Sequence, residues 1–320
     1  GSVVVGVAGP AAIGTGRRAA GPGWREILPE VGGYIGAAFV VAATAVLVGP
    51  HWDALTRIQQ ILVLAIPAVL LAGAAVAIAR SAPGGWTVHA VSGTTGRRRV
   101  VAVLLAFGSG LGAAAAGVAA GENAADRALL TTAAVLLIGA YLFCRSALLQ
   151  LGALLAVALA TVSWTAWWAQ AQWSLENPST AVGLALGAVA GGWAVAAAAG
   201  WFDEPRVGLM GAYGTGFVAA EIVAAGSTAP AIATTAYLAL AGLSATGFVG
   251  YARTRFVGHL VVAVVALATV VPQAVLDWTD GAFGAGGALL LVGLSIVGAS
   301  LVGFRVRRAD HGRPPTTPLG

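Results

Sequence analysis

Glu221 is the residue whose type and position most strongly suggest chemistry. It lies in the run GLMGAYGTGFVAAEIVAAG, residues 208–226, which carries no other charge, and it is about five residues, or roughly 7 Å, from the end of that run. An ionisable group at that depth in a membrane is costly and marks a functional-site hypothesis by default. In a second interpretation the carboxyl snorkels to the headgroups, or is neutral and hydrogen-bonded. Small alanines flank it, so we expect it to face the interior of the protein.

Residue types that commonly hold metals or act as nucleophiles are few and scattered. A single cysteine, Cys144, excludes an internal disulfide or a multi-cysteine metal site. The GSGLG stretch at 108–112 lies within an apolar run, whereas a serine nucleophile needs a strand-to-helix turn. The histidines share no helix face at metal-ligand spacing. They are His51, His89, His259 and His311. We therefore expect no catalytic residue, no metal and no cofactor.

Small residues recur every four positions in two of the apolar runs. Gly183, Gly187 and Gly191 do so in one run, and Gly108 and Gly112 do so in another. Small residues on one face let membrane helices pack closely. We expect both rows to pack within the monomer, with a dimer face and chance spacing as the alternatives.

Two glutamines and two prolines also stand within apolar runs. Gln150 and Gln273 can donate hydrogen bonds between helices or reach an interface. Pro67 and Pro272 each remove one intrahelical hydrogen bond and can kink a helix.

These residues need elements to position them, and composition decides which. The chain of 320 residues is 58% hydrophobic and 9% charged, and its mean hydropathy is +0.88. Soluble domains carry about 25% charged residues, so most of this surface must face lipid. Apolar runs of spanning length form helices, because lipid offers no hydrogen bonds to the backbone. We predict an all-α polytopic transmembrane bundle of about ten spans. They fall near residues 31–49, 59–79, 100–120, 128–144, 147–169, 180–202, 208–225, 230–250, 256–276 and 282–304.

The arginines predict the orientation of these spans. If the chain turns at Arg145 and the N-terminus is inside, fifteen arginines are cytoplasmic and only Arg57 and Arg127 lie outside. If residues 128–169 formed one helix, seven would lie inside and nine outside. The positive-inside rule favours the turn, with both termini in the cytoplasm. The same arginines explain the net charge of +5 without nucleic acid as a partner.

Neither end of the chain contains an apolar run that is typical of a transmembrane helix. We expect residues 1–30 to form a cytoplasmic N-terminal arm, residues 31–304 the transmembrane bundle and residues 305–320 a flexible cytoplasmic tail. Residues 3–14 are mildly apolar but are interrupted by Pro10, and no basic segment precedes them, so a signal peptide fits poorly. Since the only methionine is Met210, we also expect the natural protein to have residues before Gly1.

Two segments resemble a known bacterial membrane family. Residues 30–80 combine a glycine-rich first span, a turn carrying HWDAL, an arginine and a long aliphatic second span. Residues 270–302, VVPQAVLDWTDGAFGAGGALLLVGLSIVGASLV, are similar to a closing hairpin of actinobacterial members. Together they resemble the family catalogued as domain of unknown function 2157. That resemblance implies a membrane protein but brings no activity and no site residues. Members usually begin with a soluble helical segment, which residues 1–23 do not resemble.

The sequence leaves two classes of function open. Because few polar residues lie within the apolar runs, the sequence favours a non-enzymatic membrane subunit or scaffold in the cytoplasmic membrane. Its partners would be the lipid bilayer and other membrane subunits. The alternative is a transporter of small molecules or lipids, proton-coupled through Glu221. An intramembrane enzyme ranks third, because no nucleophile, base and metal ligands occur at a plausible spacing.

Overall fold

The fold is known from a computed structural model. It describes residues 49–81, 95–173, 178–227 and 229–279, with isolated positions at 39, 42 and 46, and with single residues and short stretches, the longest of them 290–294, between 284 and 298. The predicted arm at 1–30 and tail at 305–320 lie outside the described residues, as do most of the predicted spans at 31–49 and 282–304.

The described part of the chain is all-α. It contains eight helices that are long and apolar enough to cross a membrane, and each matches one of the predicted spans to within a few residues. A short 3₁₀ helix, η1 (Gly49–Ala54), precedes them. The eight helices are α2 (Arg57–Arg80), α4 (Thr95–Ala120), α5 (Ala125–Phe143), α6 (Ala147–Trp173), α7 (Ser179–Ala198), α8 (Pro205–Gly226), α9 (Pro230–Thr254) and α10 (Val257–Trp278).

Local sequence explains where several helices begin and end. Thr56 and Gln59 form a capping box at the start of α2. Pro205 and Pro230 occupy the first turns of α8 and α9, where a missing N–H costs nothing. Gly200, with φ of +75°, follows the end of α7 and adopts a backbone conformation that glycine tolerates best.

The predicted turn at Arg145 is confirmed. Helix α5 ends at Phe143 and α6 begins at Ala147, so residues 128–169 are two helices and not one. Cys144 caps the end of α5 in an extended conformation, and the Ser146 hydroxyl accepts a hydrogen bond from the Leu149 N–H in the first turn of α6.

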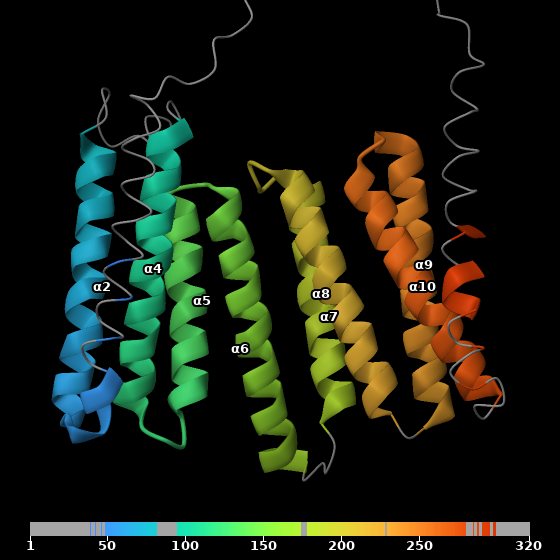
Figure 1. The fold of residues 1–320 in the computed structure, drawn as a ribbon, viewed down its shortest axis with the longest axis horizontal. Helices are drawn as coiled ribbons and strands as arrows, with labels where there is room; N and C mark the ends of the chain where they lie inside the picture. Colours follow the sequence, from blue (N-terminus) through green and yellow to red (C-terminus); the bar gives the residue numbers. More distant parts are fainter. Residues whose placement is uncertain are drawn as a thin grey trace, which may run out of the picture.

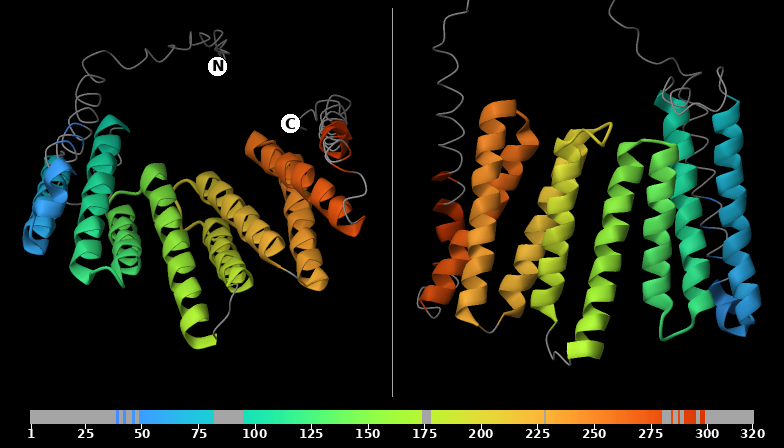
Figure 2. Two further views of the ribbon diagram at one scale, coloured as in Figure 1. Left: turned by 60° about the horizontal axis from the view of Figure 1, so that its bottom comes forward. Right: turned by 180° about the vertical axis from the view of Figure 1, so that it is seen from behind.

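The helices stand side by side and alternate in direction along the chain (Figures 1 and 2). Successive helices pack as antiparallel neighbours, most extensively α7 with α8, α2 with α4, and α4 with α5. Alanines fill many of the contacts: Ala75, Ala263 and Ala266 are fully buried. Larger apolar side chains such as Leu70, Leu142 and Leu184 point outward and are exposed, as lipid-facing residues must be.

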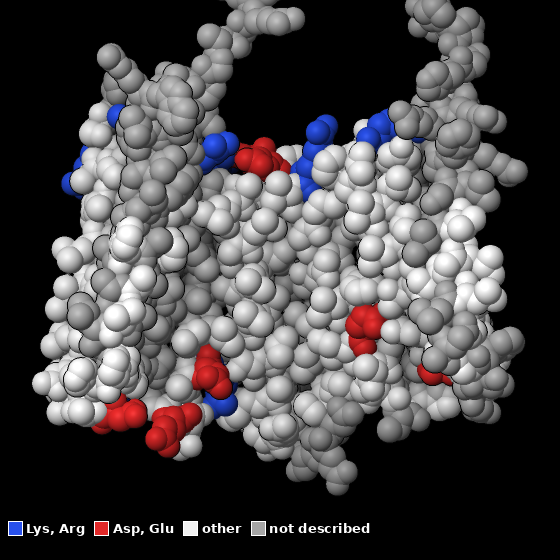
Figure 3. Space-filling view, viewed as in Figure 1, with Lys and Arg blue, Asp and Glu red and all other residues white. Residues whose placement is uncertain are grey.

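The two ends of the bundle differ in charge, as the blue and red side chains in Figure 3 show. We call the end where α4, α6, α8 and α10 begin the arginine end, and the opposite one the acidic end. Of the ten described arginines, eight lie at the arginine end and two, Arg57 and Arg127, at the other. Arg57 donates from Nε to the Val118 carbonyl over 3.0 Å, and so caps the C-terminus of α4.

Candidate functional site

Glu221 belongs to a unit formed by α8, α9 and α10. The three helices share a buried cluster that includes Ala220 of α8, Tyr237 and Leu240 of α9, and Val270 of α10. Glu221 follows Ala220 directly, and it lies five residues, or about 7 Å, from the acidic end of α8. The unit therefore places its carboxyl within the bundle and among helices that come close together.

Gln273 of α10 holds the Glu221 carboxylate. Its side-chain Nε2 donates a hydrogen bond to Glu221 Oε2 over 2.9 Å. The other oxygen of each side chain, Glu221 Oε1 and Gln273 Oε1, is buried and has no hydrogen-bond partner among the described residues. Both oxygens are acceptors while Glu221 is ionised, so each of them lacks a donor.

A second polar pair lies beside the first. The Tyr237 hydroxyl of α9 donates to Asp277 Oδ2 of α10. Gln273 and Asp277 are four residues apart on α10 and so share one face of that helix. Asp277 is in the last turn of α10 and is exposed, whereas Tyr237 is buried. We name Glu221, Gln273, Tyr237 and Asp277 the carboxyl cluster; it leads from the acidic end into the three-helix unit.

Apolar side chains close the unit above the carboxyl cluster. Leu240 is fully buried, and Phe217, Leu267 and Val270 pack in the same cluster. Beyond this layer, towards the arginine end, the buried His259 of α10 meets the Tyr213 ring edge to face, with centroids 5.7 Å apart. Polar groups thus occur on both sides of an apolar layer.

Pro272 lies in α10 directly before Gln273. Because proline has no N–H, the Ala268 carbonyl loses its usual intrahelical partner. A helix weakened at that turn bends more easily, and this turn is the one that carries the donor to Glu221.

The predicted glycine rows are only partly in contact with other helices. In α7, a Cβ at Gly183 would lie 2.2 Å from Val223 Cγ2 of α8, whereas one at Gly187 or Gly191 would meet no described atom within 4 Å. The three glycines therefore do not form one continuous contact with a described helix, because Gly187 and Gly191 are exposed. In α4 both predicted positions are close: a Cβ at Gly108 would lie 3.1 Å from the Ala68 carbonyl oxygen, and one at Gly112 would lie 3.2 Å from Leu136 Cδ1.

Gln150, the other glutamine within an apolar run, lies between two helices. Gln150 of α6 is buried beside Gly208 of α8.

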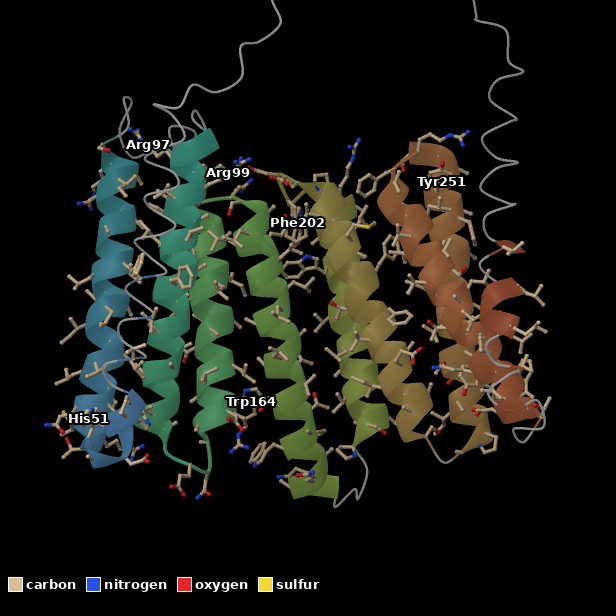
Figure 4. All side chains as sticks on the ribbon, viewed as in Figure 1. His51, Arg97, Arg99, Trp164, Phe202 and Tyr251 are labelled. Atoms are coloured by element: carbon tan, nitrogen blue, oxygen red, sulfur yellow. The ribbon has the colours of Figure 1, made fainter. Side chains whose placement is uncertain are left out.

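Tryptophans near the acidic end make polar and cation–π contacts. Trp164, labelled in Figure 4, donates from Nε1 to Thr131 Oγ1 over 2.7 Å, and Arg127 lies 4.7 Å from the Trp167 ring centroid. Such contacts suit amphipathic rings at headgroup depth.

Sequence reasoning missed two members of the carboxyl cluster. The sequence analysis singles out neither Asp277 nor Tyr237. The four-residue spacing of Gln273 and Asp277 on one helix was the available signal. Nothing in the sequence alone pairs Tyr237 with Asp277, since they lie forty residues apart.

Within the described ranges no three His, Cys, Asp or Glu side chains come together as metal ligands would. No family model matches the chain, and no curated protein or solved structure is similar to it. Composition and the eight helices therefore carry the assignment: the chain is a multi-pass membrane protein with an all-α fold.

Proposed function

We propose that the chain is a proton-coupled transporter of small molecules in the cytoplasmic membrane, and that Glu221 is its proton-binding residue. The observation that carries the proposal is the pair of buried oxygens without a donor, Glu221 Oε1 and Gln273 Oε1. A proton on Glu221 Oε1 turns that oxygen into a donor, and Gln273 Oε1 is the unsatisfied acceptor of the side chain to which Glu221 is already bonded. Acid and amide then satisfy each other through two hydrogen bonds.

The position of the carboxyl cluster supports a role in proton movement. An ionised carboxylate inside hydrocarbon is costly, so a bound proton changes the energy of this unit substantially. Asp277 is exposed at the acidic end and bonded to Tyr237. It provides the point where protons from water enter the cluster.

The apolar layer supports a carrier and not an open channel. Leu240, Phe217 and Val270 separate the carboxyl cluster from His259 and Tyr213 on the other side. Transport then requires the three helices to change their packing. Pro272, next to Gln273, is where α10 bends most readily, and protonation of Glu221 alters the bond to that same turn.

A non-enzymatic membrane subunit is the second candidate. The tight packing of the apolar layer formed by Leu240, Phe217 and Val270 favours a membrane subunit. A scaffold needs a packed core and no route for a solute. In that case the Glu221–Gln273 bond only holds α8 against α10.

We also propose an orientation in the membrane and a family likeness. We place the arginine end in the cytoplasm, because eight of the ten described arginines lie there. The likeness of residues 30–80 and 270–302 to domain of unknown function 2157 agrees with a membrane protein but adds no substrate.

Currents after a pH jump on a solid-supported membrane distinguish the two candidates. Proteoliposomes with the full chain should give a transient current as protons bind, and Glu221→Gln should abolish it while leaving the helix content unchanged. Glu122→Gln is the matched control, since Glu122 is an exposed carboxyl at the same end of the bundle. Equal currents, or none, from the parent and Glu221→Gln would reject the transporter in favour of the subunit.

A further inference from the structure

A pocket of about 440 Å³ opens at the arginine end between α4 and the start of α6. It is distinct from the carboxyl cluster, which lies at the opposite end of the bundle. Its walls combine charged, polar and apolar residues. They are Arg98, Arg99, Ala102, Val103, Ser146, Ala147, Leu148 and Glu204.

Arg98 brings an unused donor to this pocket. Asp203, in the loop after α7, accepts a hydrogen bond from Arg145 Nη1 over 3.2 Å. The same carboxylate forms an ion pair with Arg98 Nη2 at 3.7 Å, a distance too long for a hydrogen bond. Arg98 Nη2 is buried and has no hydrogen-bond partner among the described residues. A buried guanidinium nitrogen in that state calls for an anionic acceptor.

The start of α6 adds further donors to the same pocket. Ser146, which is 9% exposed, lines it and caps the helix. The N–H groups of Ala147 and Leu148, in the first turn, have no acceptor within their own helix. Together with the positive end of the helix dipole they favour an anion, and a phosphate above all.

The lower wall of the pocket is apolar. Ala102 and Val103 continue down α4, with Val103 about 12 Å along the axis from Thr95. Leu148 is half exposed on the outer surface of the bundle. The pocket therefore has hydrogen-bond donors at its upper end and apolar side chains at its lower end. A molecule with a charged head and an apolar tail matches both parts, whereas a free phosphate would contact only the donors.

We infer that the pocket binds the phosphate group of an anionic phospholipid, with its acyl chains along α4 and α6. Arg98, Arg99 and the first turn of α6 hold the phosphate, and Leu148 meets the chains. Two arginines and one glutamate line the site, so its net charge of +1 prefers an anionic lipid to a zwitterionic one. Glu204 weakens binding through repulsion. Basic side chains of this kind are the usual partners of lipid phosphates at the membrane surface.

Binding to the full-length protein in detergent, measured by native mass spectrometry, tests the inference. The probes are dioctanoyl phosphatidylglycerol, dioctanoyl phosphatidylcholine and inorganic phosphate as competitor. We expect phosphatidylglycerol to bind one site about tenfold more tightly than phosphatidylcholine, and Arg98→Gln or Arg99→Gln to weaken it about tenfold. Arg253→Gln is the matched control, because Arg253 is an exposed arginine at the same end but outside the pocket.

Glu204→Gln keeps the test decisive if Arg98→Gln fails to fold, because Glu204 makes no side-chain cap bond to α8. Its loss should tighten phosphatidylglycerol binding. Unchanged affinity in both Arg99→Gln and Glu204→Gln, or equal affinity for the two lipids, would overturn the inference. If inorganic phosphate displaces the lipid at a similar concentration, the ligand is a soluble phosphate and the lipid assignment fails.

Discussion

Gln273 of α10 donates its side-chain amide to the carboxylate of Glu221 on α8 across 2.9 Å, and this bond joins two helices that are otherwise in limited contact. Replacing Gln273 by leucine should leave the partly buried Glu221 without a donor and lower stability by about 1–3 kcal/mol. The change is measurable as a lower thermal unfolding midpoint in detergent. Thr269→Val is the control, since Thr269 bonds only the Val265 carbonyl of its own helix. Equal losses in both variants would mean that the bond does not join the helices.

Gly183 and Gly187, one turn apart on α7, should respond oppositely to alanine. At Gly183 the new Cβ would meet Val223 Cγ2 at 2.2 Å and the Ala219 carbonyl oxygen at 2.8 Å, so α7 and α8 must separate. We expect a loss of about 1–3 kcal/mol. At Gly187 no described atom lies within 4 Å, so alanine should be neutral or stabilise the helix by up to about 1 kcal/mol. Thermal unfolding of both variants measures the contrast, and a destabilised Gly187→Ala would show that its face is covered.

Cys144, between α5 and α6, should react slowly with maleimide in the folded protein. It is 1% exposed, and its thiol donates weakly to the Arg98 carbonyl at 3.6 Å. Burial raises the pKa of the Cys144 thiol, and the charge of Arg98 offsets that only in part. Because the reactive thiolate then forms at higher pH, the labelling rate should keep rising at pH values where the unfolded protein has reached its plateau. Identical pH profiles for folded and unfolded chains would contradict this burial.

Reporter fusions test the predicted orientation. Fusions after Arg145 and after Glu204 should both report cytoplasm, because the two positions lie at the arginine end. Fusions after Glu122 and after Ser227, at the acidic end, should report the opposite side. The reverse pattern would place the arginine end outside and would mean that the positive-inside rule fails for this chain.

The positions of the eight described spans could be predicted from the sequence, because lipid leaves helix as the only conformation for long apolar runs. Even the two-residue gap at Arg145 and Ser146 could be recognised as a turn from the balance of arginines between the two sides. Neighbours within the bundle were harder to predict. A regular spacing of glycines shows that a helix has a smooth face, but not which helix covers that face. Gly187 belongs to such a row, yet a Cβ there would meet no described atom within 4 Å.

The candidate site could be predicted only one residue at a time. Glu221 stands out because it is the one charge in its run, and Gln273 because it is an amide in an apolar helix. That they meet depends on how α8 and α10 pack, and no local rule links residues 52 positions apart. Tyr237 could not be recognised because a tyrosine in an apolar run usually packs as a hydrophobic ring.

Infrared spectroscopy of the carboxyl C=O stretch tests most directly whether Glu221 binds and releases a proton. The measurement compares the parent with Glu221→Gln in lipid across a range of pH. We expect a band of a protonated carboxyl that disappears reversibly as the pH rises, is absent from Glu221→Gln at every pH and shifts in Gln273→Leu. If the parent and Glu221→Gln spectra show the same carboxyl bands throughout, or if the Glu221 band does not change with pH, Glu221 is not a titrating site and the proposed proton coupling is wrong.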